Sequence, residues 1–236
     1  MARKVKIDNA VLKRRAYKSG KKTVGNRKPR KYILIVTEGI KTEPNYFEAI
    51  KKTFPKRVLE TYSIEIEGTG TSTLKIVEIA IELRDEAKRL YNRIYDHVWT
   101  VFDKDSFPVV DFNNSIFKAK SSNIKCAWSN EAFELWYVLH FQYRNTPMSR
   151  EDYKKCIETA MRKSILDKTG KKSSFKYEKN SEEMYELLQT YGNEKQAIKW
   201  AKNLEALFTN TNYSSHNPCT KVYELIEQLN DIRDDE

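Results

Sequence analysis

The first half of the chain alternates short apolar runs with segments in which apolar residues recur every three or four positions. The apolar and alternating runs predict four strands, over 32–37, 61–67, 97–102 and 124–128. The first of them, YILIVT, is continuously apolar and rich in β-branched residues. This pattern is typical of a strand that is buried on both faces of a parallel sheet.

Helical spacing predicts helices between these strands, over 42–53, 74–91 and 131–141. The segment 108–120 is ambiguous, and we assign it as a short helix. Strands and helices therefore alternate along the chain. This order predicts an α/β fold, with a Rossmann-like, mostly parallel sheet flanked by helices.

From about residue 149 the pattern becomes helical and highly charged. We expect helices over 149–163, 180–190, 193–208 and 219–231. The Lys- and Ser-rich stretch 164–179 is predicted to be an exposed loop. We found no internal repeat. The predicted organisation is one domain over 31–236 with a helical C-terminal extension over about 149–236, preceded by a segment of different composition.

That preceding segment, residues 1–30, carries most of the chain's positive charge. It holds twelve Lys or Arg and one acid, a net +11, so the whole-chain +10 leaves 10 − 11 = −1 for residues 31–236. We expect a disordered basic arm that binds nucleic-acid phosphates in a salt-dependent way. A solubilising leader is the alternative. The candidate arm contacts are Arg3, Lys4, Lys13, Arg14, Arg15, Lys21, Lys22, Arg27, Lys28 and Arg30.

Cysteine usage and hydropathy narrow the class of protein further. Cys126, Cys156 and Cys219 are widely spaced and form no CxxC pair, which argues against a disulfide framework or a zinc site. No apolar stretch approaches the roughly 18 residues of a membrane span, and the basic N-terminus lacks a signal peptide's apolar region. We expect a cytoplasmic protein with no membrane contact.

Acidic residues follow two of the predicted strands directly. Glu38 follows the first strand, and Asp103 and Asp105 follow the third. The carboxyl ends of parallel strands meet at one edge of the sheet, where ligands bind. Carboxylate oxygens there suit Mg²⁺ (or Mn²⁺), with Asp103 and Asp105 holding the cation and Glu38 either binding a second ion or acting as a general acid or base. For any one of these acids, a helix cap or an ion pair with Lys or Arg is the simpler alternative.

A strand followed by Glu-Gly, and a later strand followed by Asp-x-Asp, resembles the Toprim pattern of topoisomerases, primases and OLD-type nucleases. The text is closest to the RloB-like family, in ILIVTEGIKTEPNYF (33–47), VFDKD (101–105), SNEAFELWYVLHF (129–141) and NPCTKVYELIEQL (217–229). The resemblance runs from about residue 28 almost to the C-terminus. It implies a Toprim-like fold, Glu38 as acid or base, and Asp103 and Asp105 as the metal-binding pair.

Five further residues are candidates for a supporting role. Glu43 is either an added carboxylate or an exposed first-turn acid, and Glu134 lies among apolar residues and is predicted to face the metal. Lys104 either offsets the acids or points to solvent. His140 is a structural histidine or a phosphate contact. The resemblance implies that Asn217 packs near the active edge.

Two functions follow from these expectations. The resemblance implies a metal-dependent nuclease acting on DNA or RNA, tRNA included, in bacterial anti-phage or abortive-infection defence, controlled by an ABC- or OLD-type ATPase. The alternative is a non-catalytic module that binds nucleic acid or a nucleotide as a sensor or scaffold. A topoisomerase or primase is not favoured, because no catalytic tyrosine is marked by its context and no zinc-binding cysteine set is present. A homo-oligomer is left open.

Overall fold

The computed structural model describes residues 30–105 and 107–235. The predicted arm therefore lies outside the described residues, apart from its last candidate. Arg30 does not extend away from the fold, because its Nη2 donates a hydrogen bond to the Leu59 carbonyl at 2.7 Å.

A five-stranded sheet with the order β2-β1-β3-β4-β5 forms the centre of the molecule. Its strands are β1 (Lys31–Thr37), β2 (Tyr62–Gly68), β3 (His97–Asp103), β4 (Lys125–Asn130) and β5 (Cys219–Thr220). The first four pair in parallel, and β5 pairs antiparallel with β4. The predicted α/β class and mostly parallel sheet are confirmed, and the two-residue β5 was not foreseen.

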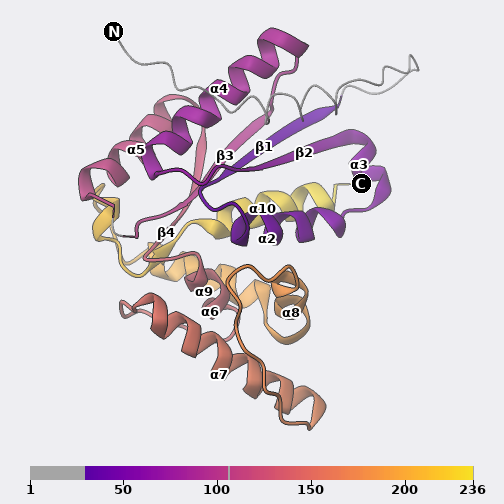
Figure 1. Ribbon diagram of the computed structural model, residues 1–236, viewed down its shortest axis with the longest axis vertical. Coiled ribbons are helices and arrows are strands. Elements are labelled where there is room, and N and C mark those ends of the chain that lie inside the picture. Colours follow the sequence, from indigo (N-terminus) through magenta and orange to yellow (C-terminus); the bar gives the residue numbers. More distant parts are fainter. Residues whose placement is uncertain (1–29, 106, 236) are drawn as a thin grey trace.

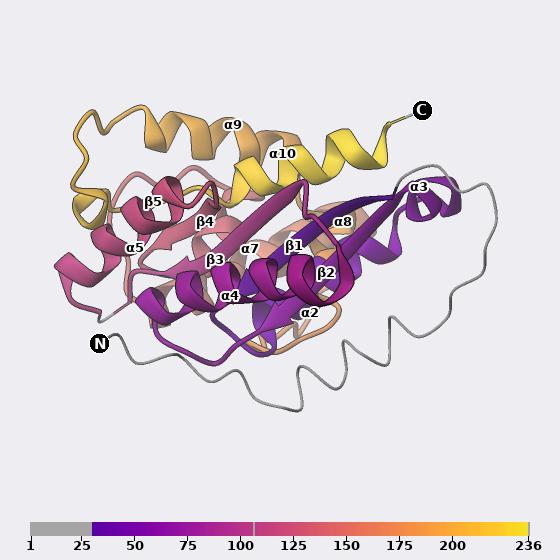
Figure 2. The ribbon, with the colours of Figure 1, turned by 90° about the horizontal axis from the view of Figure 1, so that it is seen from above.

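Helices cover both faces of this sheet (Figure 1). One face carries α4 (Thr73–Tyr91) and α5 (Val109–Ser121), and the other carries α2 (Thr42–Lys52) and α10 (Val222–Arg233). Figure 1 shows α10 on the side of the sheet opposite α4, and Figure 2 shows α10 lying next to α9. Successive side chains of β1 alternate between these two cores, because strand side chains point to opposite faces in turn. Ile33 and Ile35 enter one cluster, whereas Leu34 and Val36 enter the other.

The C-terminal helices share the core of the α2 face. They are α6 (Glu134–Leu139), α7 (Arg150–Thr169), α8 (Met184–Tyr191) and α9 (Glu194–Glu205). Each contributes side chains to the same buried cluster as β1 and β3. The helical part is therefore packed as a layer of the domain.

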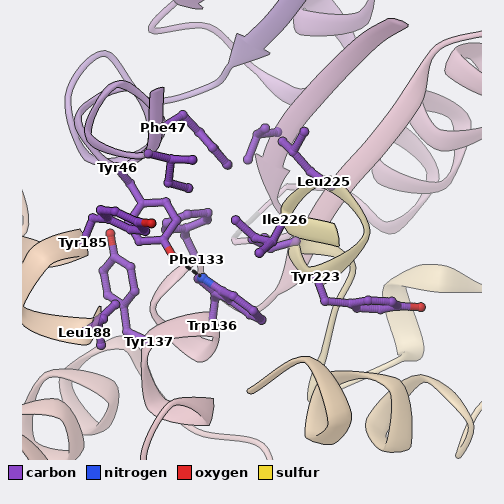
Figure 3. Packing of buried hydrophobic residues seen from close by; sticks show 14 of the residues in the cluster. Tyr46, Phe47, Phe133, Trp136, Tyr137, Tyr185, Leu188, Tyr223, Leu225 and Ile226 are labelled. Atoms are coloured by element: carbon purple, nitrogen blue, oxygen red, sulfur yellow. Dashed lines mark hydrogen bonds between the residues drawn. The ribbon is translucent and has the colours of Figure 1, made fainter. Parts of the chain in front are cut away.

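An aromatic centre joins this layer to the sheet. Tyr46 of α2 packs edge-on against Phe133 and Tyr185, with ring centroids 5.6 and 5.5 Å apart. Trp136 Nε1 donates a hydrogen bond to the Tyr46 hydroxyl at 2.7 Å (Figure 3). The buried ring system thus holds α2, α6 and α8 in fixed relation.

Several predicted boundaries were wrong. Helix α7 continues to Thr169, so the predicted loop from 164 begins too early, and α6 is shorter than the expected 131–141. The short helix α3 (Lys56–Thr61) and the 3-10 turn η1 (Tyr213–Ser215) were missed. Residues 164–169 belong to α7, because the helix does not end until Gly170. This glycine, with φ +70°, has the left-handed conformation that commonly ends a helix.

All three cysteines are free thiols in the structure. Across residues 30–105 and 107–235, no helix combines the length and apolar character needed to cross a bilayer.

Candidate functional site

The ends of β1 and β3 are adjacent and tied together by Glu38. Thr37 of β1 pairs with Val101 of β3, so the residues after each strand emerge side by side. The Glu38 backbone N–H donates to the Val101 carbonyl at 2.9 Å. Its carboxylate oxygen Oε2 accepts a hydrogen bond from the Asp103 backbone N–H at 3.1 Å. The predicted meeting of Glu38 and Asp103 at one edge of the sheet is therefore present.

Glycine follows Glu38 because the space beside its Cα is occupied. A Cβ at Gly39 would overlap the Oε2 atom of Glu43, whose carboxylate lies against this turn. A Cβ at Gly68, where β2 ends, would lie 2.8 Å from the Gly39 carbonyl and 2.9 Å from the Ile40 Cα. The two glycines let the β1 and β2 ends and the Glu43 carboxylate approach closely.

Glu43 and Glu134 complete a buried group of carboxylates. Glu43 opens α2 and is only 6% exposed, which excludes an exposed first-turn acid. Glu134 opens α6 and is 8% exposed, facing inward as predicted. The Tyr177 hydroxyl donates a hydrogen bond to Glu134 Oε1 at 3.0 Å. Four separate segments thus bring acids to one place.

Burial and mutual repulsion disfavour the charged forms of these acids. The pKa of Asp103 is raised well above its ordinary value by burial, and further by Glu43, Glu134 and Glu38. Burial also raises the pKa of Glu43, with Glu134 adding to the effect. The pKa of Glu38 is raised to about 7 by burial, against the opposing hydrogen bond from the Asp103 backbone. The electrostatics therefore favour a cation beside this group.

Arg150 is the cation that contacts the acids directly. Its Nη2 lies 3.0 Å from Asp105 Oδ2 and 4.0 Å from Asp103 Oδ2. Asp105 is partly exposed and has a left-handed backbone with φ +39°. The simpler alternative of an ion pair therefore holds for Asp105, while Asp103 is buried among the acids.

These side chains line a cleft of about 500 Å³, here called the acidic cleft. Its walls are Glu38, Gly39, Ile40, Lys41, Thr42, Glu43, Asp103, Asp105, Arg150, Lys179 and Asn180. Glu134 is not among them, although its charge contributes to the raised pKa of Asp103. The connector between α7 and α8 is fixed at the cleft, since the Thr42 hydroxyl donates to the Lys179 carbonyl at 2.8 Å.

Arg150, Lys179 and Tyr177 were missed in the sequence analysis. All three come from the C-terminal helical part, far along the chain from the strand ends. A Lys, an Arg and a Tyr in a charged helical region carry no local signal of a site. Only the packing of α7 and its connector against α2 and α6 brings them to it.

Three predicted supporting residues do not line the cleft. Lys104 Nζ donates to the carbonyls of Asp105 and Phe107, at 3.2 and 2.6 Å, and so holds the turn after β3. His140 is 2% exposed and its Nδ1 pairs with the Trp136 carbonyl at 2.9 Å, which matches the structural role. Asn217 precedes β5, two strands away from β3 in the sheet order.

The donor chemistry of the cleft fits magnesium. Within the residues that the structure describes, no three His, Cys, Asp or Glu side chains are arranged to hold a metal ion. Mg²⁺, however, needs only one or two carboxylates and completes its shell with water and substrate phosphate. Asp103 and Glu38, joined through the Asp103 N–H, offer such a pair of hard oxygen ligands.

Comparison with known proteins identifies the family. The family model described as RloB-like protein matches residues 33–229, which include both strand ends, α6 and the first part of α10. Neither the curated proteins nor the solved structures give a significant match. Since the match covers most of the chain, this protein belongs to the RloB-like protein family.

Proposed function

We propose that this protein is a metal-dependent nuclease that cleaves phosphodiester bonds at the acidic cleft. The observation that carries the proposal is a group of four carboxylates at one edge of the sheet. Glu38 and Asp103 follow or end two parallel strands and are half-buried, and the buried Glu43 and Glu134 lie beside them. Repelling buried acids are costly to a fold, and functional sites are where such groups gather.

Four side chains that line the cleft have a chemical role in this proposal. Asp103 and Glu38 would hold Mg²⁺ or Mn²⁺, which when bound would activate water and neutralise phosphate charge. Glu38, with a pKa raised to about 7, also suits proton transfer near neutral pH. Arg150 and Lys179 provide cationic groups at the cleft wall that suit a phosphate.

The biological setting is a proposal that rests on the family resemblance. We propose a bacterial anti-phage or abortive-infection effector that acts in the cytoplasm under control of an ABC- or OLD-type ATPase. The relation to Toprim and OLD-type nucleases belongs to the same proposal. Partner control would explain how a cell tolerates a nuclease.

A non-catalytic binding module is the second candidate, and one contact favours it. The Arg150 guanidinium already neutralises Asp105 at 3.0 Å, so part of the acidic group is satisfied without a metal. Such a module would bind nucleic acid or a nucleotide with no requirement for metal.

Cleavage assays separate the two candidates. Purified protein is incubated with labelled plasmid DNA and with total tRNA, in Mg²⁺, in Mn²⁺ and in EDTA, beside Asp103→Ala. A nuclease cuts one substrate class only with metal, and Asp103→Ala loses the cutting. Absence of cutting in every condition, with binding retained, favours the module. Cutting that survives Asp103→Ala rejects the assigned site.

A further inference from the structure

A second and larger cavity lies along α7, and we call it the α7 groove. Its volume is about 1000 Å³, against about 500 Å³ for the acidic cleft. One wall is a face of α7, and the other is formed by 140–144 and 191–193. In Figure 1, α7 lies at the end of the molecule farthest from α4, below α6 and α9. The groove shares no lining residue with the acidic cleft.

The groove is long. Residues of α7 line it at Asp152, Lys155, Thr159 and Lys163, spaced three or four apart on one helical face, and at Lys168 farther along the helix. The sixteen steps from Asp152 to Lys168 rise about 24 Å at 1.5 Å each. A groove of this length accommodates an extended polymer strand.

The walls are polar and carry a positive balance. Four cations line the groove, namely Arg144, Lys155, Lys163 and Lys168, against the two acids Asp152 and Asp167. The positive charge extends beyond the groove, because residues 150–179 hold ten Lys or Arg and five Asp or Glu, a net +5. Residues 31–236 as a whole have a net charge of −1, so this segment is a local basic region.

His140 and Gly192 form the closed side of the groove. The Nδ1 of His140 pairs with a carbonyl, which only accepts, so Nδ1 carries the proton and Nε2 is the acceptor of the neutral ring. Within the described residues, this buried Nε2 has no hydrogen-bond partner. A Cβ at Gly192 would lie 2.8 Å from the His140 Cβ, so the two segments that form this wall are packed against each other here.

The groove and the acidic cleft share one helix. Arg150, which contacts Asp105 at 3.0 Å, stands in the first turn of α7, and Asp152 begins the groove two residues later, about 160° away around the helix. A strand that lies along the groove must therefore pass around the N-terminal end of α7 to reach Arg150.

We propose that the α7 groove binds a single strand of nucleic acid and guides it to the acidic cleft. This inference rests on the proposed nuclease function and names its substrate as a single-stranded segment. At 3.4 Å or more per nucleotide, about 24 Å accommodates about four to seven nucleotides. Phe141 and Tyr191, which also line the groove, offer rings on which bases can stack.

The test places a cysteine reporter in the groove of the full chain. Thr159→Cys puts a thiol on the exposed groove face of α7, and Lys154→Cys puts one on the same helix outside the groove. Both are made in a Cys156→Ser background, because Cys156 is itself a free thiol that lines the groove. They are treated with a thiol reagent in EDTA, with and without a saturating ten-nucleotide thymidine oligomer, and mass spectrometry follows each peptide. We expect the oligomer to slow labelling at Thr159→Cys about fivefold or more and at Lys154→Cys by less than about twofold.

Charge reversal provides the matched control. Lys155→Glu with Lys163→Glu alters two groove cations, whereas Lys154→Glu with Lys199→Glu makes the same charge change at exposed positions outside it. We expect the first pair to raise the oligomer concentration needed for protection at Thr159→Cys about tenfold and the second to change it by less than about threefold.

The inference is overturned if the oligomer fails to bind, or binds by fluorescence anisotropy without protecting Thr159→Cys. It is equally overturned if a duplex of the same length protects this thiol as well as the single strand does. If the protein cleaves in a metal-dependent way but the oligomer does not protect Thr159→Cys, the groove is rejected as the binding site and the proposed nuclease function stands. If the oligomer protects this thiol in a protein that never cleaves, the groove is supported as a binding site and the nuclease function is rejected.

Discussion

Asp103 is a carboxylate held among other carboxylates, and we expect their mutual repulsion to lower the stability of the fold. Its pKa is raised well above the ordinary value by burial and by Glu43, Glu134 and Glu38. Asp103→Asn keeps the acceptor for the Phe133 backbone N–H and removes the charge. We expect this variant to be more stable than the natural protein in EDTA, by about 1 kcal/mol. Thermal unfolding measures the difference.

Asp231→Asn is the control for that measurement. Asp231 is exposed on α10, so its substitution should leave the melting temperature almost unchanged. A melting temperature for Asp103→Asn below that of the natural protein would mean that the acid is satisfied by its surroundings and that the repulsion argument fails.

His140 makes the stability of the protein sensitive to acid. Burial lowers the pKa of His140 to about 4, from about 6.5 in the unfolded chain. Between these values the unfolded chain binds more protons, so stability falls as pH falls from about 6.5 to 4, by up to about 3 kcal/mol. The free energy of unfolding is measured as a function of pH for the natural protein and for His140→Asn. The difference between the two isolates the contribution of His140, because the contributions of the other titrating groups are the same in both proteins. A difference that stays constant from pH 7 to pH 4 would contradict it.

The turns that follow β1 and β2 pack against each other and so position Glu38. A methyl group at Gly68 meets backbone, namely the Gly39 carbonyl and the Ile40 Cα, neither of which can rotate away. We expect Gly68→Ala to destabilise the protein by about 1–3 kcal/mol and to lower any cleavage activity, because the turn that carries Glu38 must move.

Gly170→Ala is the comparison at a second glycine. Gly170 ends α7 at φ +70° and has open space around it, so alanine there costs about 1 kcal/mol from conformation alone. It should leave cleavage unchanged. If Gly68→Ala behaves in the same way, the close packing of the two turns is not what positions Glu38.

The strands that carry the site could be predicted from the sequence, whereas elements that depend on tertiary contacts could not. YILIVT and HVWTVF are mostly apolar because β1 and β3 are buried on both faces, so their ends, and hence Glu38 and Asp103, could be located. β5 has only two residues and gains its strand geometry from pairing with Ser129 and Asn130. No local pattern marks so short a strand.

At the scale of the whole molecule, the core and the acidic cleft are both shared between the two halves of the chain. Tyr153 and Ile157 of α7 and Leu225 of α10 lie in one buried cluster with Ile33 and Ile35 of β1. The same packing brings Arg150 and Lys179 to the cleft, which is why sequence patterns near the strands could not reveal them. The segment after residue 149 is a structural part of the site.

Truncation tests this integration. A chain that ends at residue 148 loses α7 to α10 and exposes the apolar face of the sheet that α10 covers. We expect it to show no cooperative thermal transition by circular dichroism, whereas the full chain unfolds cooperatively. A cooperative transition in the truncated chain would show that the helical part is an independent appendage.

If the acidic cleft is a cation site built around Asp103, it binds Mg²⁺ or Mn²⁺ whether or not the protein is an active nuclease, and calorimetric titration measures this binding. We expect the natural protein and Asp231→Asn to give a saturable binding signal and Asp103→Asn to weaken it about tenfold or more. Equal binding by Asp103→Asn, or no binding by the natural protein, would mean that the cleft is not a cation site.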